Sequence, residues 1–293
     1  MNFQLYINDQ TISCKEMTVV LYKDLLKSIY GDEPDGVTFI QTAGSIFSSL
    51  TNKPSSFFEN LPIIDLMSCL FQLRMNSLGD RTNVSLNIDD TKRSLELRLD
   101  WVNEDLLKFN KDVINKTLKV GSIEIEMSSP SVKRLEEKIE DEYLYFIRSV
   151  KVNDRLIVLE TNEEAKNITE KLPIKVTLAI VSHFETIIKE IKKLNFLTRY
   201  QIIEHTLGFI PSIESLLWFT KLMFNESLQS FYDNIFYLAK LANIPPSYTE
   251  SCSIGEYFVY TGTLQRSLAQ QNSESSQDPS TLHNDEEGDF PEE

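Results

Sequence analysis

The sequence predicts a mostly helical α+β fold, in which a small antiparallel β module lies between an N-terminal helical unit and a C-terminal helical bundle. Apolar residues recur at the 3.6-residue spacing of an amphipathic helix before residue 79 and again beyond residue 162. Between these regions they alternate with polar residues, which is typical of half-buried strands. The predicted units are residues 1–79 (with a short leading strand), 80–160 and 161–268, followed by a disordered acidic tail at 269–293.

The N-terminal unit opens with a short strand at residues 3–7, where apolar and polar residues alternate. Thr18 is suited to cap a helix that Gly31 ends, and a second apolar segment covers residues 37–50. A third helix begins near Leu61, with a proline in its first turn, where the missing N–H costs least. Its apolar positions follow a helical period and are Ile63, Leu66, Met67, Leu70, Phe71 and Met75.

The middle region reads as paired strands. Residues 84–88 and 95–99 alternate on either side of Asp89–Lys92, which predicts a turn between antiparallel strands. A charged segment, Ser131–Glu142, predicts a short helix. Further strand candidates are Leu118–Met127 and Tyr143–Leu159.

Beyond residue 162 the periodicity is helical throughout. The helix from about Glu226 is apolar on two faces, which is typical of a helix inside a bundle or against a partner. Pro245 and Pro246 end it. The other expected features are an apolar stripe over Ile180–Leu194, a Thr198–Gln201 capping box before a helix that Gly208 ends, a Ser212 cap, and a last helix over Ile254–Leu268.

Composition indicates a folded globular protein, with 41% hydrophobic and 10% aromatic residues in 293. No apolar run reaches the roughly 18 residues of a membrane span. The opening residues have neither the basic region nor the apolar core of a secretory signal. Three widely separated cysteines, Cys14, Cys69 and Cys252, suit a reducing compartment and predict neither a disulfide framework nor a zinc site.

Much of the formal charge of −15 belongs to one segment. Residues 269–293 contain eight acidic residues and no Lys or Arg, so the difference, −7, is spread over the other residues. The folded part has no basic stripe interleaved with aromatic residues. A phosphate backbone would be repelled by the tail, and we therefore expect no nucleic-acid partner.

Motifs for catalysis, metal binding or cofactor binding are absent from the sequence. The three histidines are His183, His205 and His283, and no HExxH or CxxC spacing occurs. G-x-S-x-G, P-loop and G-x-G-x-x-G turns are also missing. The sequence therefore predicts a protein that is not an enzyme and that binds no metal or cofactor.

Aromatic residues on the last helices are candidates for partner binding, because aromatic side chains anchor protein interfaces. At helical spacing, core packing is the more common role of such residues. Both roles are compatible if a helix has one inward and one outward face, since Phe236 and Tyr237 cannot both point into the same core. The candidate partner-binding residues are Phe236, Tyr237, Tyr257 and Tyr260.

A structural role is expected for the end of the third helix, at Arg74, Ser77 and Gly79. An arginine just before a tight glycine turn can hold that turn, or the module beyond it, through fork-like hydrogen bonds.

Two segments, Ile63–Leu99 and Asn225–Tyr260, together with the early helix Thr18–Gly31, resemble the T4-like baseplate hub and hub-assembly proteins of contractile-tailed bacteriophages. The segment Asp65–Gly79, which ends in Leu-Arg-x-x-Ser-x-Gly, is the most specific match. Relatives often carry Cys-x-x-Cys where this chain has Asp89–Lys92, and Glu-Arg where it has Glu256 and Tyr257. The metal knuckle of such relatives is therefore lost here.

The resemblance implies a non-enzymatic tail assembly protein that binds other tail proteins in the host cytoplasm, as a baseplate hub component or an assembly factor, and it leaves a place in the virion open. A chaperone of the tail tape-measure protein, absent from the virion, is an alternative. A small hydrolase or a DNA-mimic inhibitor is an alternative from another class; mimicry requires acidic residues ordered on a rigid face.

Overall fold

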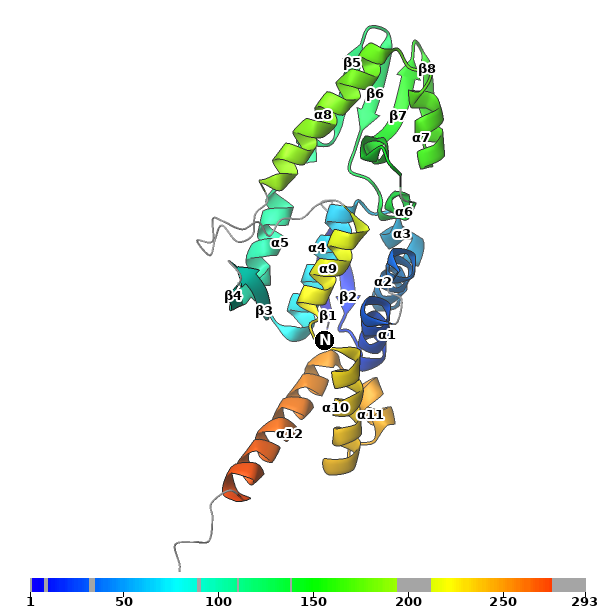
Figure 1. Cartoon of the computed structure of the whole chain (residues 1–293). Coiled ribbons are helices and arrows are strands. Elements are labelled where there is room, and N and C mark those ends of the chain that lie inside the picture. The colour runs from blue at the N-terminus through cyan, green and yellow to red at the C-terminus, as the bar shows by residue number, and fades with distance from the viewer. Residues whose placement is uncertain are drawn as a thin grey trace, which may run out of the picture.

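The structure is a computed structural model, in which helices predominate and the strands form antiparallel sheets of two, two and four strands. The predicted mostly helical α+β fold is therefore confirmed. The four-stranded sheet lies at one end of the molecule and the last three helices lie at the other (Figure 1). The described residues are 2–7, 10–31, 35–88, 91–109, 111–137, 139–193 and 212–275.

The chain opens with a hairpin. Strand β1 (Asn2–Ile7) pairs antiparallel with β2 (Gln10–Lys15), so the prediction of a single leading strand is incomplete. The second strand offers only Ile12 and Cys14 as alternating apolar residues, which is a weak signal in sequence. The helices that follow are α1 (Val19–Tyr30), α2 (Gly36–Leu50), α3 (Ser55–Glu59) and α4 (Ile63–Leu78).

Helix α4 is the central element of the fold. Every residue from Ile63 to Arg74 is buried. The helix packs against β1, α5 (Leu99–Lys108), α9 (Ile213–Met223) and α12 (Ile254–Ser275). A helix covered on several sides needs apolar residues on more than one face, which explains the apolar density of its sequence. Its buried polar residues include Asp65, Ser68, Gln72 and Arg74.

The predicted hairpin in the middle region is present. Strands β3 (Arg81–Ile88) and β4 (Thr91–Arg98) pair antiparallel in a continuous register. Leu99 is the first residue of α5 and not the end of a strand, so the predicted strand boundary is wrong there. Residues 95–99 keep an alternating pattern up to the start of the helix, and this pattern concealed the change of element.

The four-stranded sheet forms a second layer together with two helices. Its strand order is β5-β6-β7-β8, with all neighbours antiparallel. Helix α8 (Ile174–Lys192) contacts β5 and buries Val176, Ile180, Ile187 and Ile191. The remaining elements are η1 (Lys111–Val113), β5 (Lys116–Val120), β6 (Ile123–Met127), α6 (Val132–Leu135), η2 (Glu142–Phe146), β7 (Ile147–Val152), β8 (Arg155–Val158) and α7 (Asn162–Thr169).

The helices of the C-terminal region do not gather into one bundle in the described part of the chain. Helices α7 and α8 lie with the four-stranded sheet, whereas α9 packs on α4 and α2. Helices α10 (Leu228–Leu241), α11 (Pro246–Ser251) and α12 each contact α1, and they lie together at the end of the molecule away from the four-stranded sheet (Figure 1). Sequence periodicity identifies the buried face of each helix but not the element that covers it.

Helix α12 continues past Leu268 to Ser275. The prediction of a disordered tail is therefore wrong for residues 269–275, which are helical. Several expected features lie outside the described residues, namely the Asp89-Asp90 turn, the Thr198–Gln201 capping box, Gly208 and the tail from residue 276 onward.

Candidate functional site

Side chains from three other elements hold the carboxyl end of α9. The last turn of a helix leaves backbone carbonyls without intrahelical partners. Here these carbonyls accept hydrogen bonds at 2.8–3.3 Å from α1, α4 and β3, which joins α9 to the N-terminal part of the chain. The donors and acceptors pair as Tyr30 with Lys221 and Phe224, Thr82 with Leu222, and Arg74 with Met223.

Arg74 forms the centre of this junction. Its Nε donates to the carbonyl of Met223 at 2.8 Å, Nη1 to that of Gly79 at 2.8 Å and Nη2 to that of Arg81 at 3.1 Å. Gly79 ends α4 with a φ of 91°, in the left-handed region that favours glycine. Burial lowers the pKa of the guanidinium to about 10, so Arg74 stays charged at neutral pH. The arginine thus connects the ends of two helices and the start of β3.

The segments Ile63–Leu99 and Asn225–Tyr260, far apart in the sequence, meet at this junction. Asn225, after α9, donates to the carbonyl of Asn83 in β3 at 3.1 Å. Gly255, in the first turn of α12, lies beside the carbonyl of Ser77, and a Cβ at Gly255 would be in van der Waals contact with that oxygen at 3.4 Å. The Ser77 hydroxyl is buried and has no hydrogen-bond partner among the described residues. Segments far apart in sequence therefore build one local structure.

A cluster of buried aromatic rings joins α1, α10 and α12. Tyr22, Phe231 and Tyr257 are each at most 1% exposed. The ring centroid of Phe231 lies 5.9 Å from that of Tyr22 and 5.6 Å from that of Tyr257. Tyr257 therefore does not belong to the exposed surface predicted for it. It lies on the inward stripe of α12, where helical spacing alone did not separate core from surface.

A half-buried glutamate, Glu226, lies beside this cluster, and its Oε2 atom is buried. Tyr257 and Asn234 both donate hydrogen bonds to Oε1 of Glu226 at 2.9 Å. Burial raises the pKa of Glu226 above its ordinary value, and the hydrogen bonds that it accepts offset only part of this effect. Sequence reasoning missed this residue, because an acidic residue before a helix is normally solvated.

We expect the substitution Glu226→Gln to remove a pH-dependent loss of folding stability that the charged carboxylate causes. Because the pKa is higher in the folded than in the unfolded chain, the folded state binds the proton more tightly, and the penalty grows as the pH rises above the unfolded value of about 4.3. Glutamine keeps the accepting Oε1 without the charge. Urea unfolding of both proteins from about pH 5 to pH 8 should show the variant gaining stability relative to wild type as the pH rises. A difference that does not change with pH would contradict this account.

The outer face of α10 carries the exposed aromatic residues. Phe236 is 56% exposed and Tyr237 45% exposed, and their ring centroids lie 5.8 Å apart. The ammonium group of Lys240 lies 5.5 Å from the Phe236 ring centroid. Phe231 and Leu238 occupy the buried stripe, so Phe236 and Tyr237 both point away from it. We define the α10 outer face as Tyr232, Phe236, Tyr237 and Leu241, all exposed.

Tyr260 belongs to a separate pair. Its hydroxyl oxygen lies 3.4 Å from that of Tyr248, and the ring centroids are 6.5 Å apart. Tyr248 is 49% exposed on α11, whereas Tyr260 is half-buried. The sequence analysis did not select Tyr248 as a candidate binding residue, although it lies just after Pro245 and Pro246.

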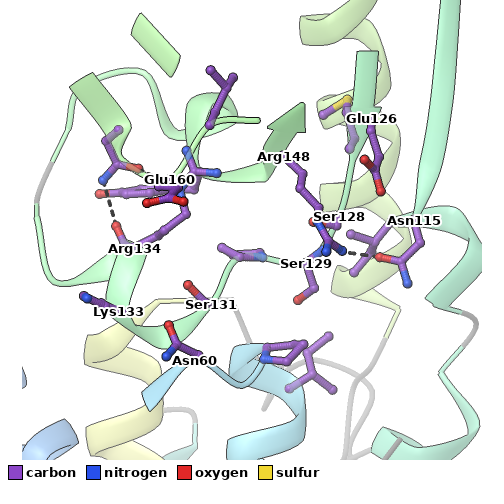
Figure 2. Close-up of a pocket in the computed structure, with 18 of the residues that line it drawn as sticks. Asn60, Asn115, Glu126, Ser128, Ser129, Ser131, Lys133, Arg134, Arg148 and Glu160 are labelled. Carbon is purple, nitrogen blue, oxygen red and sulfur yellow. Dashed lines mark hydrogen bonds between the residues drawn. The ribbon is translucent and has the colours of Figure 1, made fainter. Parts of the chain in front are cut away.

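A polar cavity of about 1010 Å³ lies between the start of α4 and the four-stranded sheet. Figure 2 shows Lys133, Arg134 and Glu160 on one side of it and Asn115 and Ser129 on the other. Arg134 is held by its own module, with hydrogen bonds of 2.6 Å and 3.0 Å to the carbonyls of Ile147 and Leu144. Basic and acidic side chains both line the cavity, so its charge favours no single class of ligand.

The described residues contain no group of three or more His, Cys, Asp or Glu side chains placed to hold a metal ion. Burial raises the pKa of the Cys14 thiol to about 12, which disfavours the reactive thiolate. His183 is partly buried on α8, and burial lowers its pKa. His205 and His283 lie outside the described residues. No described helix combines the length and apolar character needed to span a bilayer.

A family model described as T4 bacteriophage base plate protein matches residues 1–198. The match includes Arg74, Ser77 and Gly79 and ends before α9, so that α10 and its outer face lie beyond it. No curated protein and no solved structure matches the chain.

Proposed function

Because the chain belongs to the family of T4 bacteriophage base plate proteins, we propose that it is a non-enzymatic phage tail protein that acts in baseplate hub assembly by binding other tail proteins. The family match carries this proposal, since it supports a structural or assembly role in the phage baseplate. In the proposal the protein works in the host cytoplasm while the tail is built, and its association with the virion baseplate follows from the same role.

The α10 outer face is the proposed contact surface. Aromatic side chains bury a large area with few rotatable bonds, and they dominate the binding energy of many protein interfaces. Two neighbouring rings at Phe236 and Tyr237, with the Lys240 ammonium beside them, offer an apolar anchor with a polar edge.

We expect single alanine substitutions on this face to abolish partner binding without unfolding the protein. Truncating an aromatic anchor costs about 2–4 kcal/mol of binding energy, which is roughly a 30- to 1000-fold loss of affinity. The measurement is a pull-down from cells that express the tail genes, comparing wild type with Phe236→Ala and Tyr237→Ala. At least one variant should lose a tail protein that wild type retains, with unchanged circular dichroism.

Tyr6→Ala is the matched control, because Tyr6 is an aromatic residue 59% exposed on a different element, β1. It should retain every partner. If both α10 variants also retain every partner, the binding surface lies elsewhere and the proposed site is wrong. The identity of the captured protein separates a hub protein from the alternative, the tape-measure protein.

A further inference from the structure

A second, smaller cavity of about 420 Å³ lies at the Arg74 junction. It is bounded by the end of α4, the residues after α9 and the first turns of α12. Phe258 and Val259 stand at its edge and are 36% and 62% exposed, so the apolar walls continue to the protein surface. The cavity therefore combines an apolar lining with access from solvent.

Arg74 supplies a positive charge in the wall of this cavity. Arg74 is only 7% exposed, and the hydrogen bonds of its guanidinium to three carbonyls leave two of the five N–H groups unused. None of the carboxylates in the described ranges forms an ion pair with it. Buried charges are normally paired. The carbonyl dipoles hold the arginine in place, but they leave its net charge without an opposite full charge.

Ser77 provides a second, independent observation. It is 6% exposed, lines the same cavity, and its hydroxyl has no hydrogen-bond partner within the described part of the chain. A buried hydroxyl without a partner costs free energy, and a ligand oxygen would satisfy it. A guanidinium and a free hydroxyl beside apolar walls match a carboxylate that is adjacent to an apolar or aromatic side chain.

We propose that the acidic segment Asp285–Glu293 of this chain docks in the Arg74 cavity. Its sequence, DEEGDFPEE, places Phe290 directly after the carboxylate of Asp289, and residues 276–293 contain no Lys or Arg. The segment can reach the cavity. Returning along α12 from Ser275 to Phe258 covers about 26 Å, whereas an extended chain from Ser275 to Asp289 spans about 45–50 Å. A tether of this length gives the docking step a high effective concentration.

The test uses the full chain with a photo-reactive phenylalanine analogue in place of Phe290. Irradiation and mass spectrometry should place its crosslinks on the first turns of α12 and the end of α4. When chains labelled with light and heavy isotopes are mixed before irradiation, every crosslink should join two light or two heavy peptides, which shows that it lies within a single chain. Crosslinks between chains would identify a second copy as the occupant, and scattered or absent crosslinks would show an empty cavity; either result overturns the proposal.

The matched control compares two substitutions of opposite charge at one exposed position, Val259. Val259→Glu places a carboxylate at the cavity edge and should reduce the crosslinks by about tenfold, a modest change in binding free energy. Val259→Lys changes the size of the side chain similarly and should preserve them. Equal loss in both variants would mean that charge does not direct the docking, which contradicts the proposal. This outcome is independent of the pull-down result for α10.

Discussion

Replacing Arg74 by alanine is expected to lower the free energy of unfolding by about 3–5 kcal/mol. The substitution removes hydrogen bonds to the carbonyls of Met223, Gly79 and Arg81. The Met223 carbonyl belongs to the last turn of α9, which has no intrahelical donor for it. The Arg74→Ala substitution also leaves a void in the space that the guanidinium fills. Urea unfolding followed by circular dichroism measures the loss.

Arg81→Ala is the control for this experiment. Its side chain is 58% exposed and pairs with Glu96 on the surface, so we expect a change of about 0.5 kcal/mol or less. An Arg74→Ala variant as stable as the Arg81→Ala variant would show that the junction between α4 and α9 does not depend on the guanidinium.

Phe231→Ala should destabilise the protein by about 3–5 kcal/mol, whereas Phe236→Ala on the same helix should cost about 1 kcal/mol or less. Phe231 is 1% exposed and its ring packs against Tyr22 and Tyr257, while Phe236 is 56% exposed. The substitution is identical in both variants, and only the burial of the ring differs.

Thermal and urea unfolding of the two variants measure this difference. Similar large losses in both would mean that Phe236 is a core residue, and the α10 outer face would no longer be available for a partner. The comparison thus separates the structural from the binding role of the two phenylalanines before any partner is tested.

The helices were predictable where apolar residues recur at a helical period. This period, from Ile63 to Met75, predicted α4, and the structure shows that β1, α5, α9 and α12 pack against it. The start of α5 was not predictable, because the alternation of Leu95, Leu97 and Leu99 continues to the point where the helix begins. Local pattern therefore located elements better than it located their boundaries.

The partners of each helix depended on tertiary contacts that no local pattern contains. Helix α8 ends at Lys192 and α9 begins at Ile213, yet α8 packs on the sheet and α9 on α4. A capping arginine and a glycine turn indicated that Arg74 holds a junction. The acceptor on α9 lies 149 residues away and could not be inferred.

The candidate site shows the same division between local and tertiary information. The conflict between Phe236 and Tyr237 was visible in the helical period, and both rings are exposed. Tyr257 is also an aromatic residue at helical spacing, like Phe236 and Tyr237. It is fully buried, because its side of α12 faces α1 and α10. Glu226 was missed, since its burial depends on Tyr257 and Asn234 from two later helices.

Electron microscopy of phage lysates tests the central claim most directly. Cells are infected with a phage whose copy of this gene carries an early stop codon, and they are complemented with wild-type protein or with Phe236→Ala. Without complementation, and with a Phe236→Ala protein that has lost its partner, we predict tails that lack a completed baseplate hub, whereas wild-type protein restores complete tails. Complete, infectious particles in the absence of the protein would contradict a role in baseplate assembly.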